Sequence, residues 1–139
     1  MIEYHYQTNF KLNHPEEYTD WINKCITIGG SNAGSINFVF CSDDELLKIN
    51  QDYLGHDFYT DIITFQYESA PVISGDIYIS VDRVLENANT FKENFSTEMK
   101  RVMIHGVLHL LGYNDKSDLE KEVMRAKEAE LIAMFHVKH

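Results

Sequence analysis

The stretch STEMKRVMIHGVLHLLGYND, residues 96–115, contains the clearest helical pattern in the chain. Its apolar residues recur every three or four positions, which predicts a helix with one face buried in the core. These residues are Met99, Val102, Met103, Val107 and Leu110. Ser96 is the expected N-cap and Gly112 the expected end of the helix. We therefore predict that this helix is a main element of the core.

Two histidines in this stretch, His105 and His109, are four residues apart and so project from one face of the predicted helix. Gly112 allows the chain to turn and to bring Asp115 back toward them. Two imidazole nitrogens and one carboxylate oxygen would leave one position of a zinc ion open, as in catalytic zinc sites. The sequence predicts a metal site at His105, His109 and Asp115. The alternative is a pair of buried or capping histidines that bind no metal.

The residue after the first histidine, Gly106, separates this pattern from the H-E-x-x-H motif of zinc proteases. Those enzymes use the glutamate as a base, and glycine has no side chain to replace it, so peptide hydrolysis is disfavoured. Cleavage of RNA does not require a glutamate base at this position, because a metal ion lowers the pKa of water to about 7 and polarises a phosphoryl oxygen. We also expect Gly106 to leave room for a bulky substrate beside the metal.

The composition fits one globular domain covering residues 1–139. A formal net charge of −10 argues against a broad basic surface for nucleic acid, so any RNA contact must be local or assisted by metal. Cys25 and Cys41 form no C-x-x-C pair, and we expect both to be reduced core residues. The sequence contains neither a long apolar run nor a recognisable leader, so we expect a cytoplasmic protein without membrane contact.

Periodicity along the chain alternates between strand and helix patterns. Strands are expected at residues 2–10, 36–41, 61–67 and 75–80, with 61–67 and 75–80 as neighbours. Helices are expected from Pro15 to Gly29, from Ser42 to Gly55, over 81–88 and 96–112, and from Ser117 to about Phe135. This order predicts an α+β fold with one four-stranded mixed sheet and about five helices packed against it.

The eleven residues from His105 to Asp115 resemble the signature H-G-x-L-H-L-x-G-Y-D-H of the YbeY family, metal-dependent endoribonucleases of ribosomal RNA maturation. The last two positions differ, since Asn114 replaces aspartate and Asp115 replaces the third histidine of the family. A carboxylate can bind zinc at this place. It also changes the charge of the site by one unit and favours harder cations such as Mn²⁺ or Mg²⁺.

Two further stretches carry the same resemblance. INQDYLGHDFYTDIITF, residues 49–65, resembles the family's L-N-x-x-Y-R-G-x-D-x-x-T-D-V-L-S-F, and SGDIYIS, residues 74–80, resembles L-G-D-I-x-I-S. The matching residues are Asn50, Tyr53, Gly55, Asp57, Thr60, Asp61, Phe65, Gly75, Asp76, Ile77, Ile79 and Ser80. One departure concerns RNA binding: Leu54 occupies the place of an arginine that would be a natural phosphate clamp.

The resemblance implies a single-strand-specific, metal-dependent endoribonuclease that matures small-subunit ribosomal RNA. It implies one Zn²⁺ per chain, with Mn²⁺ or Mg²⁺ as alternatives, and as partners ribosomal RNA, the small ribosomal subunit and ribosome-associated proteins. One alternative is a non-catalytic, ribosome-associated metal-binding factor, which the missing arginine at Leu54 favours. A zinc metallopeptidase ranks last because of Gly106.

Other polar residues are weaker candidates. Thr60, Asp61 and Asp76 could contact substrate or accept a hydrogen bond from a ligand histidine, but they could equally cap turns and strand ends. Lys121, Arg125 and Lys127 lie in a charged helix that is expected to face solvent and could touch RNA. His5, His14 and His56 are expected to be surface or capping residues, and the terminal His136 and His139 are not expected to hold a metal.

Overall fold

A computed structural model describes residues 1–135, and over this range the chain forms four strands and five helices. The elements are β1 (Ile2–Tyr6), α1 (Pro15–Ile28), β2 (Asn32–Cys41), α2 (Asp43–Leu54), β3 (Ile62–Glu68), β4 (Val72–Ser80), α3 (Val81–Phe91), α4 (Phe95–Leu110) and α5 (Asp118–Ile132). The predicted α+β class and the predicted order of elements are confirmed.

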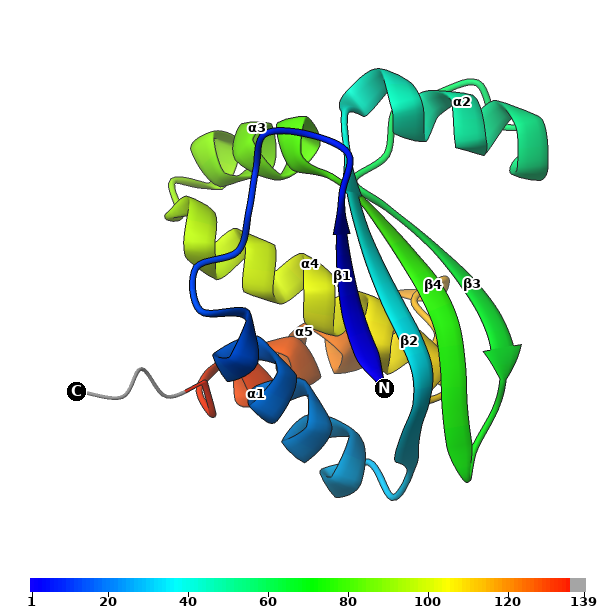
Figure 1. Cartoon of the computed structure of the whole chain (residues 1–139), viewed down its shortest axis with the longest axis vertical. Coiled ribbons are helices and arrows are strands. Elements are labelled where there is room, and N and C mark those ends of the chain that lie inside the picture. The colour runs from blue at the N-terminus through cyan, green and yellow to red at the C-terminus, as the bar shows by residue number, and fades with distance from the viewer. Residues whose placement is uncertain (136–139) are drawn as a thin grey trace.

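The four strands form one mixed sheet in the order β1-β2-β4-β3 (Figure 1). Strands β1, β2 and β4 run parallel, whereas β3 pairs antiparallel with β4. The neighbouring strands predicted at 61–67 and 75–80 are thus confirmed as a pair. Because β3 lies at the edge of the sheet, only one of its two sides pairs with another strand.

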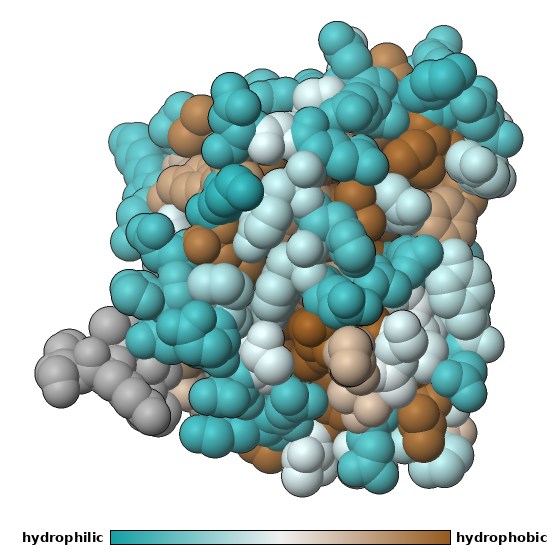
Figure 2. All heavy atoms as spheres, in the orientation of Figure 1, coloured by the Kyte–Doolittle hydropathy of each residue, from teal (hydrophilic) through white to brown (hydrophobic). Residues whose placement is uncertain are grey.

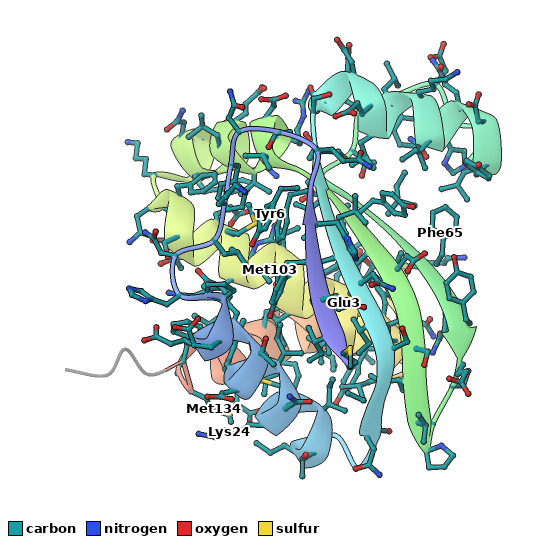
Figure 3. The ribbon with its side chains drawn as sticks, in the orientation of Figure 1. Glu3, Tyr6, Lys24, Phe65, Met103 and Met134 are labelled. Atoms are coloured by element: carbon teal, nitrogen blue, oxygen red, sulfur yellow. The ribbon has the colours of Figure 1, made fainter. Side chains whose placement is uncertain are left out.

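The helices lie on both faces of the sheet. The larger core lies between the sheet and helices α1, α3 and α4, and α5 packs mainly against α4 (Figure 1). Met103 of α4 lies in this core, while Phe65 projects from β3 on the opposite face (Figure 3). On that face a smaller cluster of Cys41, Leu46 and Ile63 lies beneath α2.

Polar side chains cover most of the surface seen in Figure 2, with apolar atoms visible in smaller areas between them. Among residues 1–135, no helix combines the length and the apolar character that crossing a membrane requires.

Two glycines allow α4 to lie close to the sheet. A Cβ atom at Gly106 would lie 2.9 Å from Ile77 Cγ2 and 3.0 Å from Ile62 Cδ1. A Cβ atom at Gly75 of β4 would lie similarly close to Leu110 of α4 and to the backbone carbonyl of Phe65. Our expectation that Gly106 leaves room for substrate is therefore wrong, because this residue is buried and its missing side chain makes room for the sheet.

Some element boundaries differ from the predicted ones. The first strand ends at Tyr6, opposite Phe40, because its partner β2 ends one residue later. The alternating pattern continues to Phe10 because that ring packs against Phe40 and Phe95 from a loop. The cap of α4 is Asn94, whose side chain accepts a hydrogen bond from the amide of Thr97 at 2.7 Å, and is not Ser96 as predicted.

Strands β2 and β4 begin earlier than predicted, at Asn32 and Val72, which lie opposite each other in the sheet. Small polar residues in 29–35 resemble a turn in the sequence, but backbone pairing with β4 makes most of them part of a strand. An irregularity in register between Ala33 and Ile36 accommodates this segment.

We predict that Gly75→Ala lowers the free energy of unfolding by about 1–3 kcal/mol, because the new methyl group meets a backbone carbonyl that cannot rotate away. Gly106→Ala should cost less, because the alanine favours the helix by about 1 kcal/mol and partly offsets the crowding. Urea unfolding of both variants measures the difference. Wild-type stability of Gly75→Ala would contradict this view of the close contacts that Gly75 makes with Phe65 of β3 and Leu110 of α4.

Candidate metal centre

His105, His109 and Asp115 are brought together as the sequence predicts. The Nε2 atoms of the two histidines are 3.1 Å apart, and Asp115 Oδ2 lies 3.2 Å from His105 Nε2 and 3.5 Å from His109 Nε2. A tetrahedral zinc ion with bonds of about 2.0–2.1 Å separates its ligand atoms by about 3.3 Å. The triangle therefore has the size that three zinc ligands require, and these residues form a possible metal-binding group.

A short, well-anchored loop holds Asp115 in place. Gly112 takes a φ of 102°, a conformation that L side chains rarely adopt, so the chain turns sharply at the end of α4. The amide of Tyr113 donates to the carbonyl of Leu108 at 3.0 Å on the near side of the loop. On the far side, Ser117 and Glu120 form a capping box that starts α5. Both ends of the loop are thus fixed by hydrogen bonds.

Glu128 of α5 orients His105. Its Oε2 atom lies 2.6 Å from His105 Nδ1, and the residue is 2% exposed. A carboxylate can only accept a hydrogen bond, so Nδ1 carries the hydrogen and the lone pair of Nε2 points toward His109 and Asp115. Orientation of a metal-binding histidine by a carboxylate is a common arrangement in proteins. The sequence did not reveal this contact, because Glu128 lies in a separate helix of alternating charges.

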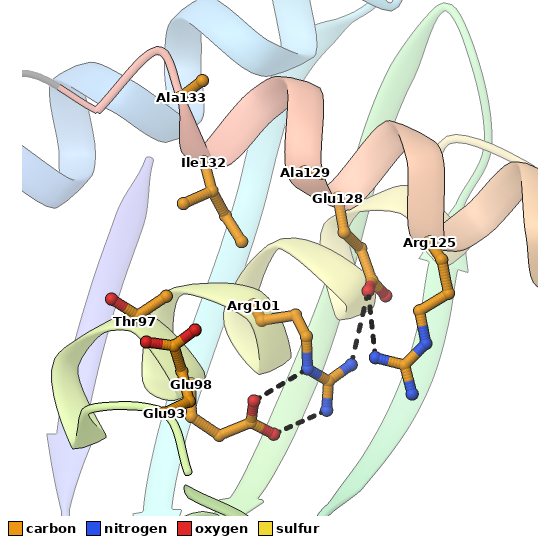
Figure 4. A pocket seen from close by; sticks show the side chains of 9 residues that line it. All are labelled: Glu93, Thr97, Glu98, Arg101, Arg125, Glu128, Ala129, Ile132 and Ala133. Carbon is orange, nitrogen blue, oxygen red and sulfur yellow. Dashed lines mark hydrogen bonds and ion pairs between the residues drawn. The ribbon is translucent and has the colours of Figure 1, made fainter. Parts of the chain in front are cut away.

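Arg101 holds Glu128 and the neighbouring Glu98 in a buried network (Figure 4). Its guanidinium donates to both oxygens of Glu98, at 2.7 and 3.0 Å, and to Glu128 Oε1 at 3.4 Å. Burial alone would lower the pKa of Arg101, but hydrogen bonding and charge from Glu98, followed by Glu128 and Asp61, outweigh it and raise the pKa. Arg101 therefore stays charged and balances the two buried carboxylates.

The sequence does contain a signal for this network. Glu98, Arg101 and His105 are spaced three and four residues apart, so they form a polar stripe along one side of an otherwise apolar helix. Figure 4 shows Glu98 and Arg101 on α4 facing Glu128 on α5. Next to this network, α4, α5 and the segment before α4 line a cavity of about 390 Å³, and the two histidines are not among its lining residues.

The weaker candidates lie in different places. Thr60 and Asp61 line the same cavity as the two histidines, and Asp61 accepts a hydrogen bond from Asn87 at 3.2 Å. Asp76 instead accepts from Asn37 at 3.1 Å and from the Tyr67 hydroxyl at 2.9 Å, outside this cavity. The carboxylate that lies within hydrogen-bond distance of His105 Nδ1 is therefore that of Glu128, rather than that of Asp61 or Asp76.

A cavity of about 640 Å³ opens in front of the histidines and Asp115. Its walls come from the end of α2, the following loop, β3 and the loop before α5. The residues that line it are Asn50, Leu54, His56, Phe58, Thr60, Asp61, Ile62, Ile63, Thr64, His105, His109, Asp115 and Lys116. His56, which we expected to be a surface or capping residue, belongs to this wall and is exposed. Leu54, at the place where the resemblance implies an arginine, also belongs to it.

Basic residues lie on the other side of His105. Lys121 and Arg125 line a second cavity, of about 300 Å³, together with His105 and Asp115. Lys127, the third basic residue considered in this helix, forms an ion pair with Glu130 at 2.7 Å and does not line either cavity. Lys116 lines the first cavity, and Lys121 and Arg125 line the second. Although the chain is acidic, cations therefore lie on both sides of the candidate metal ligands.

Within residues 1–135, the remaining candidates contribute no ligands to this group. Cys25 and Cys41 are buried free thiols, and burial raises the pKa of each to about 12, so both are protonated at neutral pH. This agrees with their prediction as reduced core residues. His136 and His139 lie outside the described residues.

Comparisons with known proteins agree with the resemblance seen in the sequence. The family model described as Endoribonuclease YbeY matches residues 3–136. The chain is 51% identical over 137 residues to a protein of Flavobacterium johnsoniae named Endoribonuclease YbeY, and the match covers 99% of each chain. A similarly named protein of Flavobacterium psychrophilum is 49% identical over 138 residues, again covering 99% of each.

A solution structure of a protein from Thermotoga maritima has the same fold. It superposes with a TM-score of 0.67 at 26% sequence identity, and the match covers 95% of this chain and 87% of that one. Sequence similarity over nearly the full length and this shared architecture lead to one assignment: the chain belongs to the YbeY family.

Proposed function

We propose that this protein is a metal-dependent endoribonuclease. The observation that carries the proposal is the triangle of His105, His109 and Asp115, whose edges suit a single divalent ion and which lies in an open cavity. Relatives that match 99% of the chain are named as endoribonucleases, which supports RNA as the substrate. The whole chain, residues 1–139, acts in this proposal as one catalytic domain.

Zinc is the proposed ion, bound once per chain by His105, His109 and Asp115. Two imidazoles and one carboxylate are a ligand set that zinc accepts, with a further position left for water or substrate. The carboxylate in place of a third imidazole also makes Mn²⁺ or Mg²⁺ acceptable. When bound, the ion would polarise a phosphoryl oxygen and make water more acidic.

The surrounding residues position the ion and the RNA. Glu128 keeps His105 Nε2 directed at the centre of the group, and Arg101 holds Glu128. Lys116 on one side, with Lys121 and Arg125 on the other, supply positive charge for the phosphates of the strand. These local cations take the place of the arginine that Leu54 replaces. Thr60 and Asp61 face the same cavity and are close enough to contact a bound nucleotide.

The proposed biological substrate is unpaired ribosomal RNA of the small ribosomal subunit, processed in the cytoplasm with ribosome-associated proteins as further partners. The net charge of −10 supports recognition through a local site, since the chain lacks the excess of cations that broad RNA binding requires. A glutamate at position 106, as in zinc proteases, would collide with Ile77 and Ile62, which supports a nuclease over a peptidase.

We predict that the purified protein with one equivalent of Zn²⁺ cleaves single-stranded RNA, and that His109→Ala abolishes cleavage because it removes a ligand. His5→Ala is the matched control, since His5 lies on β1 and contacts Asn37 at the sheet surface. Gel analysis of end-labelled RNA measures both. Equal cleavage by His109→Ala, in preparations free of contaminating nuclease, would contradict this prediction. Folded, zinc-bound protein that cleaves nothing, with Mn²⁺ and Mg²⁺ also inactive, would favour the non-catalytic binding factor.

We further predict that Glu128→Gln weakens zinc binding about 10- to 100-fold, because a neutral amide orients His105 less well than a carboxylate. Competition with a coloured chelator measures the affinity at a temperature where both proteins are folded. Glu122→Gln, an exposed change on the same helix, is the control and should bind zinc normally. Wild-type zinc affinity in folded Glu128→Gln would show that Glu128 serves only its ion pairs with Arg101 and Arg125.

A further inference from the structure

Two stacked rings form part of the cavity wall. His56 and Phe58 lie in the loop after α2, with ring centroids 5.1 Å apart and planes inclined by 18°. Both residues line the cavity that also contains His105 and His109. Phe58 is 56% exposed, so a large apolar ring is left accessible beside the candidate metal group. Single exposed apolar residues are ordinary, but a stacked pair inside this cavity offers a flat surface to a ligand.

Hydrogen bonds to Asn50 of α2 hold the loop that carries these rings. Asn50 is 1% exposed, and its side-chain amide donates to the carbonyl of Phe58 at 2.9 Å. The amide of His56 donates to the carbonyl of Asn50 at 3.1 Å. Gly55, with a φ of 68°, provides the turn out of α2. These bonds fix the backbone of the loop on both sides of the rings, so the aromatic surface is formed before any ligand binds.

The neighbouring aromatic residue has a different environment. The Tyr59 hydroxyl donates to Asp44 at 3.2 Å, and the guanidinium of Arg83 lies 5.2 Å from the Tyr59 ring centroid. Tyr59 is 48% exposed but does not line the cavity. Of these two adjacent exposed aromatic residues, only Phe58 lines the cavity that contains the candidate metal ligands.

A ligand that suits this cavity has a flat ring for Phe58 and an anionic group for the metal centre and Lys116. A nucleotide has both, because its base stacks on aromatic rings and its phosphate binds cations. We propose that an unpaired base of the RNA stacks on the Phe58–His56 pair and that the adjoining phosphate is thereby placed at His105, His109 and Asp115. This inference rests on the proposed function and assigns the substrate contact that selects single strands.

Selection of single strands follows from the stacking geometry. Bases in a duplex are covered by their neighbours above and below, so they cannot also lie on a protein ring unless the helix opens. Every base has a flat face, so this contact tolerates many sequences. It also supplies binding energy at a cavity where Leu54 cannot hold a phosphate as an arginine would.

The test uses the zinc-loaded full chain and a single-stranded RNA that carries 2-aminopurine, whose fluorescence falls when it stacks. Stopped-flow fluorescence records binding before cleavage. We expect quenching with the wild type, loss of quenching with Phe58→Ala, and a rise in Kd of about 5- to 150-fold for this variant. Phe58→Trp should retain both signals, and Tyr59→Ala should match the wild type.

The outcomes separate this inference from the proposed function. Quenching by the wild type that Phe58→Ala loses, in a protein that cleaves no RNA, would support the stacking contact and refute the nuclease. Cleavage by Phe58→Ala with unchanged Kd and unchanged quenching would overturn the stacking contact and leave the nuclease standing. Absence of RNA binding by the zinc-loaded wild type, or an equal loss with Tyr59→Ala, would also overturn the contact.

Discussion

The structure depends on the close contact between α4 and the strands β3 and β4. Gly106 on the helix and Gly75 on the strand remove the side chains that would otherwise separate them, so the apolar face of α4 reaches the sheet. With that face buried, the helix must turn His105 and His109 toward the edge strand and the loop of Asp115. The packing of the core and the position of the candidate metal centre therefore have one cause.

Burial of charge beside this contact has to be balanced. Glu98 and Glu128 are 3% and 2% exposed, and the desolvation of two carboxylates would be costly without a cation between them. Arg101 compensates both, which leaves Glu128 free to accept the hydrogen of His105 Nδ1. We infer that the network is kept because it orients the imidazole, since an apolar core of the same shape could serve stability alone.

The sequence predicted what depends on local patterns and less of what depends on contacts between distant segments. Spacing of four residues placed His105 and His109 together, and Gly112 indicated the turn that returns Asp115. Glu128 could not be assigned from spacing, because only the packing of α5 on α4 brings it to His105. The room that Gly106 was expected to leave for substrate was misjudged, because the sequence does not show that Ile77 of the sheet lies against this residue. Strand lengths also depended on partners that periodicity does not reveal.

In the function proposed above, His105, His109 and Asp115 bind one zinc ion. X-ray diffraction from crystals of the zinc-loaded protein, measured above and below the zinc absorption edge, tests it most directly. We predict a single anomalous peak about 2.0–2.2 Å from His105 Nε2, His109 Nε2 and an oxygen of Asp115. A peak bound at another place, or crystals that contain zinc with Asp115 turned away from it, would contradict the claim.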